Sequence, residues 1–371
     1  MQSPRNPNQA PRSRDVLGVP RLPPGRATVA VNRLRALHGR VHASAAPPPL
    51  RIMESLFGML DHRVLVALCE AGVPDALHHP TSITDLADQL KVDPAMLHRL
   101  CVFADTHGWL RLDRKGRVCP TRVTEFLHND HPGGWRAWVD FAGGAEVVAA
   151  VQALSLSANV PDAFCAVNGS SFFEWMRTHT DRWATFDRAM AAGGRMHALG
   201  LSAALDWRAS GSVCDVGGGT GDLLAALLDL HPHLRGQVLD LPEVVTRCDR
   251  HDRMEATSGD AFESVPTGHD TYLLVNVLHD WGDAEATRIL SNVAAAVHVG
   301  GRVIVVDTDP AQARTSRVAA ATDVLMAALT PGGHERTTDE FIALGAAAGL
   351  RHDRTVRLAS ADLAHCFLGG A

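Results

Sequence analysis

The 371-residue chain carries 35 Lys and Arg side chains against 41 Asp and Glu, a net charge of −6, which argues against a protein that coats nucleic acid, because phosphate binding needs a basic face. Its seven cysteines are scattered and never spaced as Cys-x-x-Cys, so neither a disulfide framework nor a zinc site is expected, and a reducing cytoplasm fits best. No apolar run approaches the roughly 20 residues that a membrane helix needs, so no membrane partner is expected.

The first 48 residues differ from this average. Eight arginines lie between Arg5 and Arg40 against the single acid Asp15, with prolines interspersed. An Arg-rich, acid-poor N-terminus can be an organelle transit peptide, but the prolines and the weak amphipathic pattern favour disorder. We therefore predict that residues 1–48 are a disordered Arg- and Pro-rich tail.

Helices are expected to dominate residues 49–170. The stretch RIMESLFGMLDHRVLVALCEAGVPDAL has apolar residues at helical spacing and ends near Gly72 and Pro74. It is followed by a capped helix in TSITDLADQL, a second helix with Pro94 in its first turn in DPAMLHRLCVFADTHGWL, and a hairpin around Lys115-Gly116 in LRLDRKGRVCPT. Helix, helix and hairpin in this order are typical of a winged-helix domain.

The second helix of this domain is poorly suited to reading DNA. A winged helix contacts DNA through basic side chains on that helix. Here it offers His98 and Arg99 beside Asp93 and Asp105. We therefore predict a scaffold or dimerisation role, with a cofactor-sensing DNA-binding regulator as the minor alternative.

From residue 171 the pattern changes, through a helical stretch, into strands that alternate with helical or loop segments. The strands are SVCDV, GQVLDL, MEATSGD, TYLLVNVL and GRVIVVD, a pattern typical of a mostly parallel sheet covered on both faces. Two last runs, RTVRLAS and LAHCFLGG, are expected to close a seven-stranded sheet with an antiparallel edge. The predicted fold class is α/β: a Rossmann-like domain over residues 171–371, preceded by the helical winged-helix domain.

A glycine-rich turn follows the first of these strands. Gly217, Gly219 and Gly221 lie between a strand and a helix, where backbone amides approach a ligand and a Cβ is not tolerated. Asp240 ends the next strand, 19 residues after Gly221, where a carboxylate can accept hydrogen bonds from both ribose hydroxyls. The pair indicates a nucleotide-like ligand.

The spacing argues against a dinucleotide. The dinucleotide fingerprint is GxGxxG, with a diphosphate at the helix N-terminus, whereas here the spacing is GxGxG and the helix begins with the acid Asp222. A cationic, phosphate-free adenosine cofactor such as S-adenosylmethionine fits better. Asp260, in SGDAF, either accepts from the adenine amino group or caps the following helix, and the sequence favours neither.

Six motifs in order carry a family resemblance. They are VCDVGGGTG, VLDLPEVV, SGDAFESVP, VLHDWGD, GGRVIVVD and TPGGHERTTDEF, and together they closely resemble the S-adenosylmethionine-dependent O-methyltransferases of the caffeate and bacterial polyketide type. The resemblance covers about residues 50–371, because the winged-helix half is similar to that family's dimerisation domain. It implies S-adenosylmethionine as cofactor, no metal, a small-molecule acceptor, a homodimer and a place in secondary metabolism such as antibiotic biosynthesis.

By position, the resemblance implies a general base at His279 and two flanking acids at Asp307 and Glu335. Asp307 is one methylene shorter than the Glu usual in the family, so its distance to His279 decides its role. The implied cofactor contacts are Gly217, Gly219, Asp240, Leu241, Asp260, Ala261 and Trp281, the last packed against the adenine. The implied acceptor contacts are Phe186, Met190 and Met326, although apolar positions at helical spacing usually indicate core packing.

The resemblance and the chemistry of histidine together indicate transfer of a methyl group to a hydroxyl. Flanking carboxylates would raise the pKa of His279 and orient its ring, and a phenol, which titrates near pH 10, is far easier to activate than an aliphatic alcohol. The alternative for His279 is a strand-end histidine bonded to the backbone; its place at the ligand-binding end of a parallel strand favours the base. Some relatives use the same cofactor site for decarboxylation or hydroxylation, and this alternative stays open.

Overall fold

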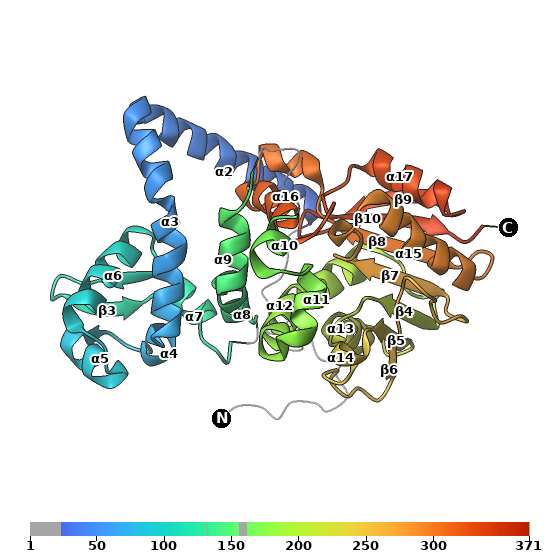
Figure 1. Cartoon of the computed structure of the whole chain (residues 1–371), viewed down its shortest axis with the longest axis horizontal. Coiled ribbons are helices and arrows are strands. Elements are labelled where there is room, and N and C mark those ends of the chain that lie inside the picture. The colour runs from blue at the N-terminus through green and yellow to red at the C-terminus, as the bar shows by residue number, and fades with distance from the viewer. Residues whose placement is uncertain (1–23, 132, 156–161, 371) are drawn as a thin grey trace, which may run out of the picture.

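The computed structural model describes residues 24–131, 133–155 and 162–370, as a helical N-terminal half beside a helix-covered sheet (Figure 1). No helix in these ranges is both long and apolar enough to cross a membrane. The elements of the first half are α2 (Gly25–Ala45), α3 (Pro48–Glu70), α4 (Val73–Ala76), β1 (Thr81–Ser82), α5 (Ile83–Leu90), α6 (Pro94–Thr106), β2 (Leu110–Leu112), β3 (Arg117–Pro120) and α7 (Arg122–Phe126).

The winged-helix prediction is confirmed. Ser82 caps α5 by accepting a hydrogen bond from the backbone N–H of Asp85, and the carboxylate of Asp93 caps α6 in the same way. The β2–β3 hairpin turns through Gly116, whose φ of 73° needs a residue without a Cβ. With β1 on the other side of β3, the hairpin forms a small antiparallel sheet beside α5 and α6.

The prediction of a disordered tail is wrong for residues 25–45, which form the helix α2. The prolines that suggested disorder end at Pro24, and the next is Pro47. Between them the chain is rich in Ala, Leu and Arg, residues with good helix propensity. The hydroxyl of Thr28 also donates a hydrogen bond of 2.8 Å to the carbonyl of Ala359, so tertiary contact adds to propensity. Residues 1–23 lie outside the described ranges.

Six helices join the two halves, namely α8 (Trp135–Ala142), α9 (Ala145–Gln152), α10 (Ala163–Asn168), α11 (Phe172–Thr178), α12 (Thr180–Ala204) and, from later in the chain, α16 (Arg317–Leu329). Their aromatic side chains form one buried cluster, in which Phe141 and Phe172 meet edge to face at 6.2 Å between ring centroids. The cluster includes Phe164 on α10 and Leu329 on α16. A boundary between residues 170 and 171 stays a prediction, because this core spans it.

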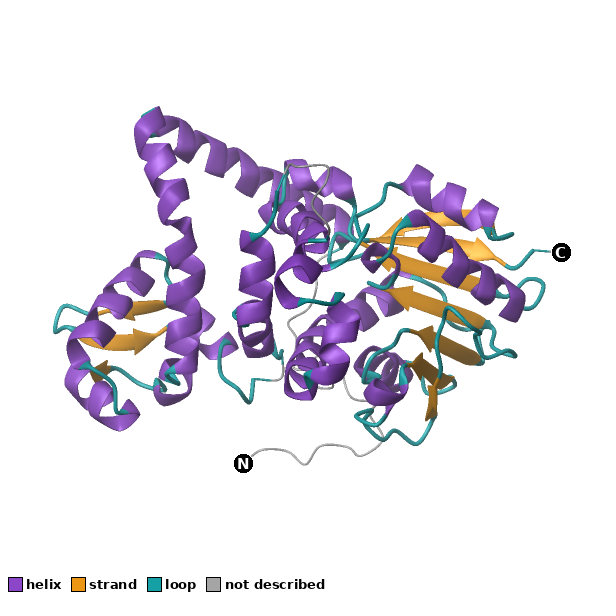
Figure 2. Ribbon diagram, in the orientation of Figure 1, coloured by secondary structure: helices purple, strands orange, loops and turns teal. Residues whose placement is uncertain are grey.

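The second half is a seven-stranded sheet with helices on both faces (Figure 2). The strand order is β6-β5-β4-β7-β8-β10-β9, and β10 alone runs in the direction opposite to the other six strands. This confirms the predicted parallel sheet with two C-terminal strands. Its elements are β4 (Ser212–Val216), α13 (Asp222–Leu230), β5 (Arg235–Asp240), α14 (Pro242–Val245), β6 (Met254–Ser258), β7 (Thr271–Val275), the 3-10 turn η1 (Leu278–Asp280), α15 (Asp283–Ala296), β8 (Arg302–Asp307), the 3-10 turn η2 (Pro310–Arg314), α17 (Thr338–Ala347), β9 (Arg351–Arg357) and β10 (Leu363–Leu368).

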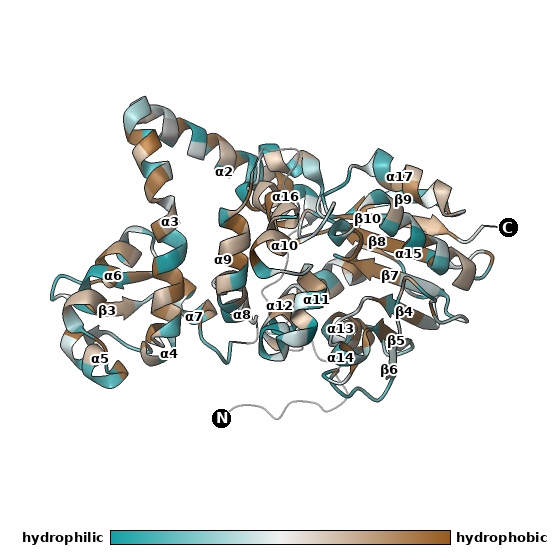
Figure 3. Ribbon diagram, viewed as in Figure 1, coloured by the Kyte–Doolittle hydropathy of each residue, from teal (hydrophilic) through white to brown (hydrophobic). Residues whose placement is uncertain are grey.

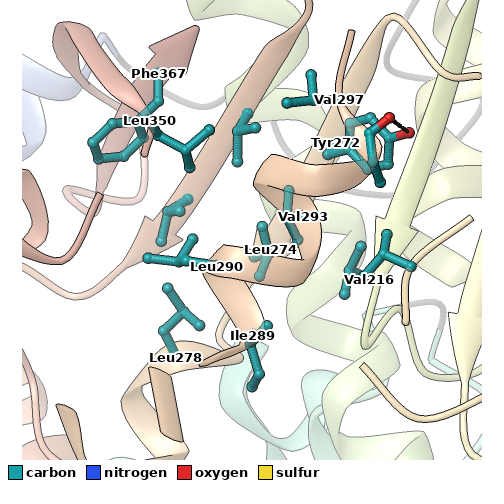
Figure 4. Packing of buried hydrophobic residues seen from close by; sticks show 14 of the residues in the cluster. Val216, Tyr272, Leu274, Leu278, Ile289, Leu290, Val293, Val297, Leu350 and Phe367 are labelled. Carbon is teal, nitrogen blue, oxygen red and sulfur yellow. Dashed lines mark hydrogen bonds between the residues drawn. The ribbon is translucent and has the colours of Figure 1, made fainter. Parts of the chain in front are cut away.

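Alternate residues of each central strand bury themselves against opposite helices. Leu273 of β7 faces the cluster built with α12 and α13, while Leu274 faces the cluster built with α15 and α17. Figure 4 shows the second cluster, with Tyr272 and Leu274 close to Val293 of α15. Burial on both faces explains why these strands are continuous apolar runs.

The strand β7 ends earlier than the apolar run TYLLVNVL suggests. Asn276 adopts a left-handed φ of 54° and donates its N–H to the carbonyl of Val306, a conformation that asparagine tolerates better than branched residues. The chain then turns through η1, which carries His279. His279 therefore sits on a short turn beyond the strand and not on the strand itself.

We predict that Tyr272→Phe lowers the thermal stability of the protein. The buried hydroxyl of Tyr272 lies 2.8 Å from the carbonyl of Pro266 and 3.1 Å from that of Ala296, so its removal leaves carbonyls without a donor, at a cost of about 1–3 kcal/mol. Differential scanning calorimetry should show a lower melting temperature than that of wild type. Val299→Ala, at a side chain 73% exposed, is the control and should not change it; equal melting of Tyr272→Phe and wild type would refute the assignment.

Candidate active site

The predicted site residues meet at one edge of the sheet. The glycine turn follows β4, Asp240 ends β5, Asp260 follows β6, His279 follows β7 and Asp307 ends β8. These five strands are parallel, so their carboxyl ends share that edge. Strand order reverses at β4, which lies between β5 and β7, and ligands of open α/β sheets bind at such a point.

The glycine turn is a tight backbone loop fastened to Asp240. Gly217, Gly219 and Gly221 all have positive φ, at 70°, 61° and 84°. The N–H of Gly219 donates a 2.7 Å hydrogen bond to one carboxylate oxygen of Asp240, and the N–H of Leu241 donates to the other at 2.7 Å. Burial raises the pKa of Asp240 to about 6 although these hydrogen bonds oppose the rise.

A second carboxylate beneath this loop was not predicted. Asp215, on β4, is 2% exposed, and its Oδ2 has no hydrogen-bond partner in the described structure. Burial, with the nearby charge of Asp240, raises the pKa of Asp215 to about 7. A Cβ on Gly218 would lie 2.8 Å from Oδ2, so the loop lies directly over this carboxylate. The signal was available: an acid within the apolar strand SVCDV has no structural reason to be buried.

The other predicted cofactor contacts surround the same loop. The carboxylate of Asp260 accepts from the N–H of Phe262 at 2.9 Å. Residues 261–263 form a turn and no helix lies between β6 and β7, so the expected helix cap is wrong, and the adenine contact stays a prediction. Ala261 is partly buried, and its carbonyl accepts from Asn292. The ring of Trp281 stacks on Phe173 at 5.5 Å and meets Phe262 edge-on at 4.7 Å. Contact of these residues with an adenine stays a prediction.

His279 is held by one acid at hydrogen-bond distance and by a second slightly farther away. Its Nδ1 lies 3.0 Å from Oε1 of Glu335 and 3.7 Å from Oδ1 of Asp307. At this distance Asp307, the shorter acid, acts on the ring through its negative charge and does not accept a hydrogen bond from it. A carboxylate only accepts, so Nδ1 carries a hydrogen in both charge states of the ring, and Nε2, 3.8 Å from Oδ1 of Asp280, is the nitrogen that gains or loses a proton.

Arg336 holds the loop of Glu335 against the turn of His279, a role that sequence reasoning missed. Its guanidinium is fully buried and donates to the carbonyls of Leu278 and Trp281, at 2.7 and 2.6 Å, and to Asp283 at 2.9 Å. Three contacts from one rigid fork fix η1 relative to the loop. In the sequence nothing distinguishes this arginine from a surface arginine.

The charges around His279 determine its protonation. Burial alone would lower the pKa of His279, but the negative charge of Asp307 and the hydrogen bond to Glu335 raise it to about 10. Burial raises the pKa of Asp307 well above its usual range, and the charge of His279 opposes that rise. With these neighbours the imidazolium form predominates at neutral pH.

Ligand atoms of His279, Asp307 and Glu335 lie within 4.8 Å of one another, a set that could also hold a metal ion. The hydrogen bond from His279 to Glu335 accounts for their closeness without one. Such a cluster is what a histidine base oriented by carboxylates requires, so the geometry needs no ion as explanation.

The three predicted acceptor contacts are in or beside the aromatic core. Phe186 of α12 packs edge to face on Phe141 at 5.3 Å and on Phe172 at 5.4 Å, and Met190 is partly buried beside the same cluster. Met326 of α16 is buried. These contacts support the packing interpretation, and acceptor contact stays a prediction for all three.

Comparison with known proteins agrees with this geometry. Residues 148–351 match an O-methyltransferase domain and residues 53–130 an O-methyltransferase dimerisation domain. The chain is 32% identical to a mitomycin biosynthesis 6-O-methyltransferase from Streptomyces lavendulae, over 85% of this chain and 92% of that protein. It is 31% identical to an aclacinomycin 10-hydroxylase from Streptomyces purpurascens, over 72% and 75%.

A solved structure is also similar. An O-methyltransferase from neocarzinostatin biosynthesis, in complex with S-adenosyl-L-homocysteine and 1,4-dihydroxy-2-naphthoic acid, has a TM-score of 0.69 at 28% identity, covering 84% of this chain and 96% of that one. Fold and site thus define an α/β methyltransferase with an N-terminal dimerisation domain. The chain belongs to the O-methyltransferase family.

We predict that His279 titrates with a pKa of about 10. In NMR spectra of protein labelled with ¹⁵N-histidine, the resonance that His279→Gln removes should keep imidazolium shifts well above neutral pH. Asp307→Asn and Glu335→Gln should each move the midpoint down, because each removes a group that favours the charged ring. A wild-type midpoint near the ordinary 6.5 would contradict the geometry.

Proposed function

We propose that this enzyme transfers a methyl group from S-adenosylmethionine to a phenolic hydroxyl of a small aromatic or polyketide-like natural product, with His279 as general base. The observation that carries the proposal is the 3.0 Å hydrogen bond from Nδ1 of His279 to Glu335, which leaves Nε2 for the acceptor proton. The names of the relatives support the acceptor class, since they concern mitomycin and dihydroxynaphthoate compounds.

The acids at the glycine turn support the cofactor. Asp215 has a buried oxygen without a partner and Asp240 lies beside it, which suits a ligand with an ammonium group and ribose hydroxyls. Asp222 is an acid in the first turn of α13, and its negative charge disfavours a diphosphate at this helix end, although Arg195 lies 2.7 Å away and partly offsets that charge. When bound, the cofactor supplies an electrophilic methyl group on a positively charged sulfur.

The remaining chemistry is done by this chain's own residues. The phenol O–H bond would break as Nε2 of the neutral His279 ring takes the proton, and the oxygen would take the methyl group as its bond to sulfur breaks, which leaves S-adenosylhomocysteine. Asp307 and Glu335 stabilise the resulting imidazolium. Proton transfer from a phenol, which titrates near 10, to a neutral His279 with a pKa of about 10 is close to balanced. Because the ring is mostly imidazolium at neutral pH, the step requires that the charge of the bound cofactor lower this pKa and release the proton of Nε2. An aliphatic alcohol is too weak an acid for this base.

The enzyme is proposed to be a cytoplasmic homodimer that has neither nucleic acid nor membrane as partner. The dimerisation domain over residues 53–130 supports the homodimer. All seven cysteines are free thiols, which suits a reducing compartment.

Hydroxylation or decarboxylation at the same cofactor site is the alternative function. The similarity to an aclacinomycin 10-hydroxylase favours it as second candidate. A cofactor-sensing regulator is a third, and specific DNA binding in a gel shift would be its evidence.

We predict that His279→Ala slows methyl transfer by about 10²–10⁴-fold, the usual contribution of a general base. Release of S-adenosylhomocysteine, measured with a panel of phenols, gives the rate, and calorimetry should find cofactor affinity unchanged. His298→Ala, which removes an exposed histidine elsewhere on the molecule, is the matched control.

Two results would decide against the proposal. Methylation by His279→Ala at the wild-type rate, with the cofactor bound, would remove His279 as base. A wild-type product that gains an oxygen or loses carbon dioxide, and no methyl group, would establish the alternative reaction by its mass.

We also predict that S-adenosylmethionine lowers the pKa of His279 more than S-adenosylhomocysteine does. The two differ by the methyl group and the positive charge on sulfur, and a cation near the ring disfavours imidazolium. The same NMR titration, with each compound at saturation, measures the difference. Equal pKa values with both would show that the sulfur lies too far from His279 to act on it.

A further inference from the structure

An arginine and an aspartate form a close ion pair between α12 and the segment that follows α14. Nε of Arg247 donates a hydrogen bond of 2.6 Å to Oδ2 of Asp187, and Asp187 is buried. Hydrophilic and hydrophobic colours alternate along α12 in Figure 3, and Asp187 directly follows the predicted acceptor contact Phe186 on this helix. Neither member of the pair is among the predicted site residues.

The segment that carries Arg247 lies against the glycine turn. The next residue, Cys248, donates from its Sγ to the carbonyl of Gly219 at 3.3 Å. Burial raises the pKa of Asp240, and the positive charge of Arg247 is among the groups that oppose this rise. Arg247 is therefore close to the carboxylate that is expected to bind the ribose.

The guanidinium of Arg247 is held in place and still has a donor without an acceptor. It lies over the ring of Trp183 on α12, 5.5 Å from the ring centroid, a contact that favours a fixed orientation of the planar group. Nε is bound by Asp187, but the buried Nη2 has no hydrogen-bond partner in the described structure. A buried cationic nitrogen without an acceptor is costly, so a ligand that brings an acceptor to Nη2 gains affinity.

The proposed cofactor contains one group that needs such a donor. S-adenosylmethionine has a single negatively charged group, the carboxylate of its methionine part. The cofactor contacts that the family resemblance implies include the acids Asp240 and Asp260 and no cationic residue, and Asp215 adds a further buried acid beneath the glycine turn. Arg195 lies near the same turn, but Asp222 already binds it at 2.7 Å. The carboxylate of the cofactor therefore requires a positive charge from another residue.

We propose that Nη2 of Arg247 binds the methionine carboxylate of the cofactor, while Asp187 holds the guanidinium in place through Nε. The inference rests on the cofactor proposed above and adds a cationic residue to its site. The guanidinium has five N–H donors in a rigid plane, so one arginine can bind a carboxylate of the protein and a carboxylate of the ligand together. Because Asp187 follows Phe186, this contact links the bound cofactor to the helix of the predicted acceptor contacts.

The test compares two ligands of the full-length protein by isothermal titration calorimetry. One is S-adenosylhomocysteine, and the other is decarboxylated S-adenosylhomocysteine, which keeps the adenosine, the sulfur and the ammonium group but lacks the carboxylate. We expect Arg247→Met to raise the dissociation constant of S-adenosylhomocysteine about ten- to a hundredfold, the usual loss for a hydrogen bond to a charged group, and to leave that of the analogue unchanged. Arg247→Lys keeps the charge and should recover part of the loss.

Two further variants separate binding from folding. Arg250→Met is the matched control, because it removes an exposed arginine from the same segment, and it should change neither dissociation constant. Arg247→Met leaves the carboxylate of Asp187 buried without its partner, which costs stability. The double variant Asp187→Asn with Arg247→Met removes that charge as well, and it should show the same loss for S-adenosylhomocysteine alone. Circular dichroism identifies the variants that fold.

Three outcomes would overturn the proposal. If the folded variants without Arg247 bind S-adenosylhomocysteine as tightly as wild type, Nη2 does not hold the carboxylate, although the proposed cofactor stands. If they lose affinity equally for both ligands, Arg247 acts on the ribose site through Asp240 and not on the carboxylate. If wild type binds neither S-adenosylhomocysteine nor S-adenosylmethionine, the proposed cofactor fails and this inference fails with it.

Discussion

The site depends on one buried hydrogen bond, from Nδ1 of His279 to Glu335, with the charge of Asp307 beside it. Removing an imidazole and two carboxylates from water costs several kcal/mol for each ion, and only close mutual attraction offsets that cost. The surrounding residues hold both partners of this hydrogen bond in place. Arg336 binds the carbonyls on both sides of His279, and the N–H of Glu335 donates to Asp323 of α16. The hydrogen is therefore held on Nδ1 only when β8, α16 and the loop that follows α16 are all in place.

Much of the fold and of the position of the site could be predicted from the sequence, because both depend on local sequence patterns. Runs such as GRVIVVD alternate with helical segments, which predicts a parallel sheet, and such a sheet places Asp240, His279 and Asp307 at one edge. The GxGxG spacing together with Asp222 separated this loop from dinucleotide sites. The roles of individual residues came from the family resemblance, and the cofactor and acceptor contacts are still predictions.

The rest could not be predicted because it depends on contacts between distant segments. α2 was taken for disorder because the prolines before it dominate the composition, and its contact with Ala359 has no trace in the sequence. Arg336 is typical of a surface residue until the fold buries it. The early end of β7 depends on Asn276 turning left-handed, and which nitrogen of His279 is free depends on a residue 56 positions later. Asp215 is different, since its strand already contained the signal.

The place of β10 has a consequence for synthesis. This strand is the last of the seven to be made, yet it lies between β8 and β9 and pairs Leu363 with Asp307. Those two residues are 56 positions apart, which at 5–20 residues per second is about 3–11 s of translation. Until then the Val- and Ile-rich β8 has an open edge, the kind of strand that pairs with other chains. Slow translation between β8 and β10 would therefore favour aggregation of nascent chains before His279 and its two neighbouring acids can come together.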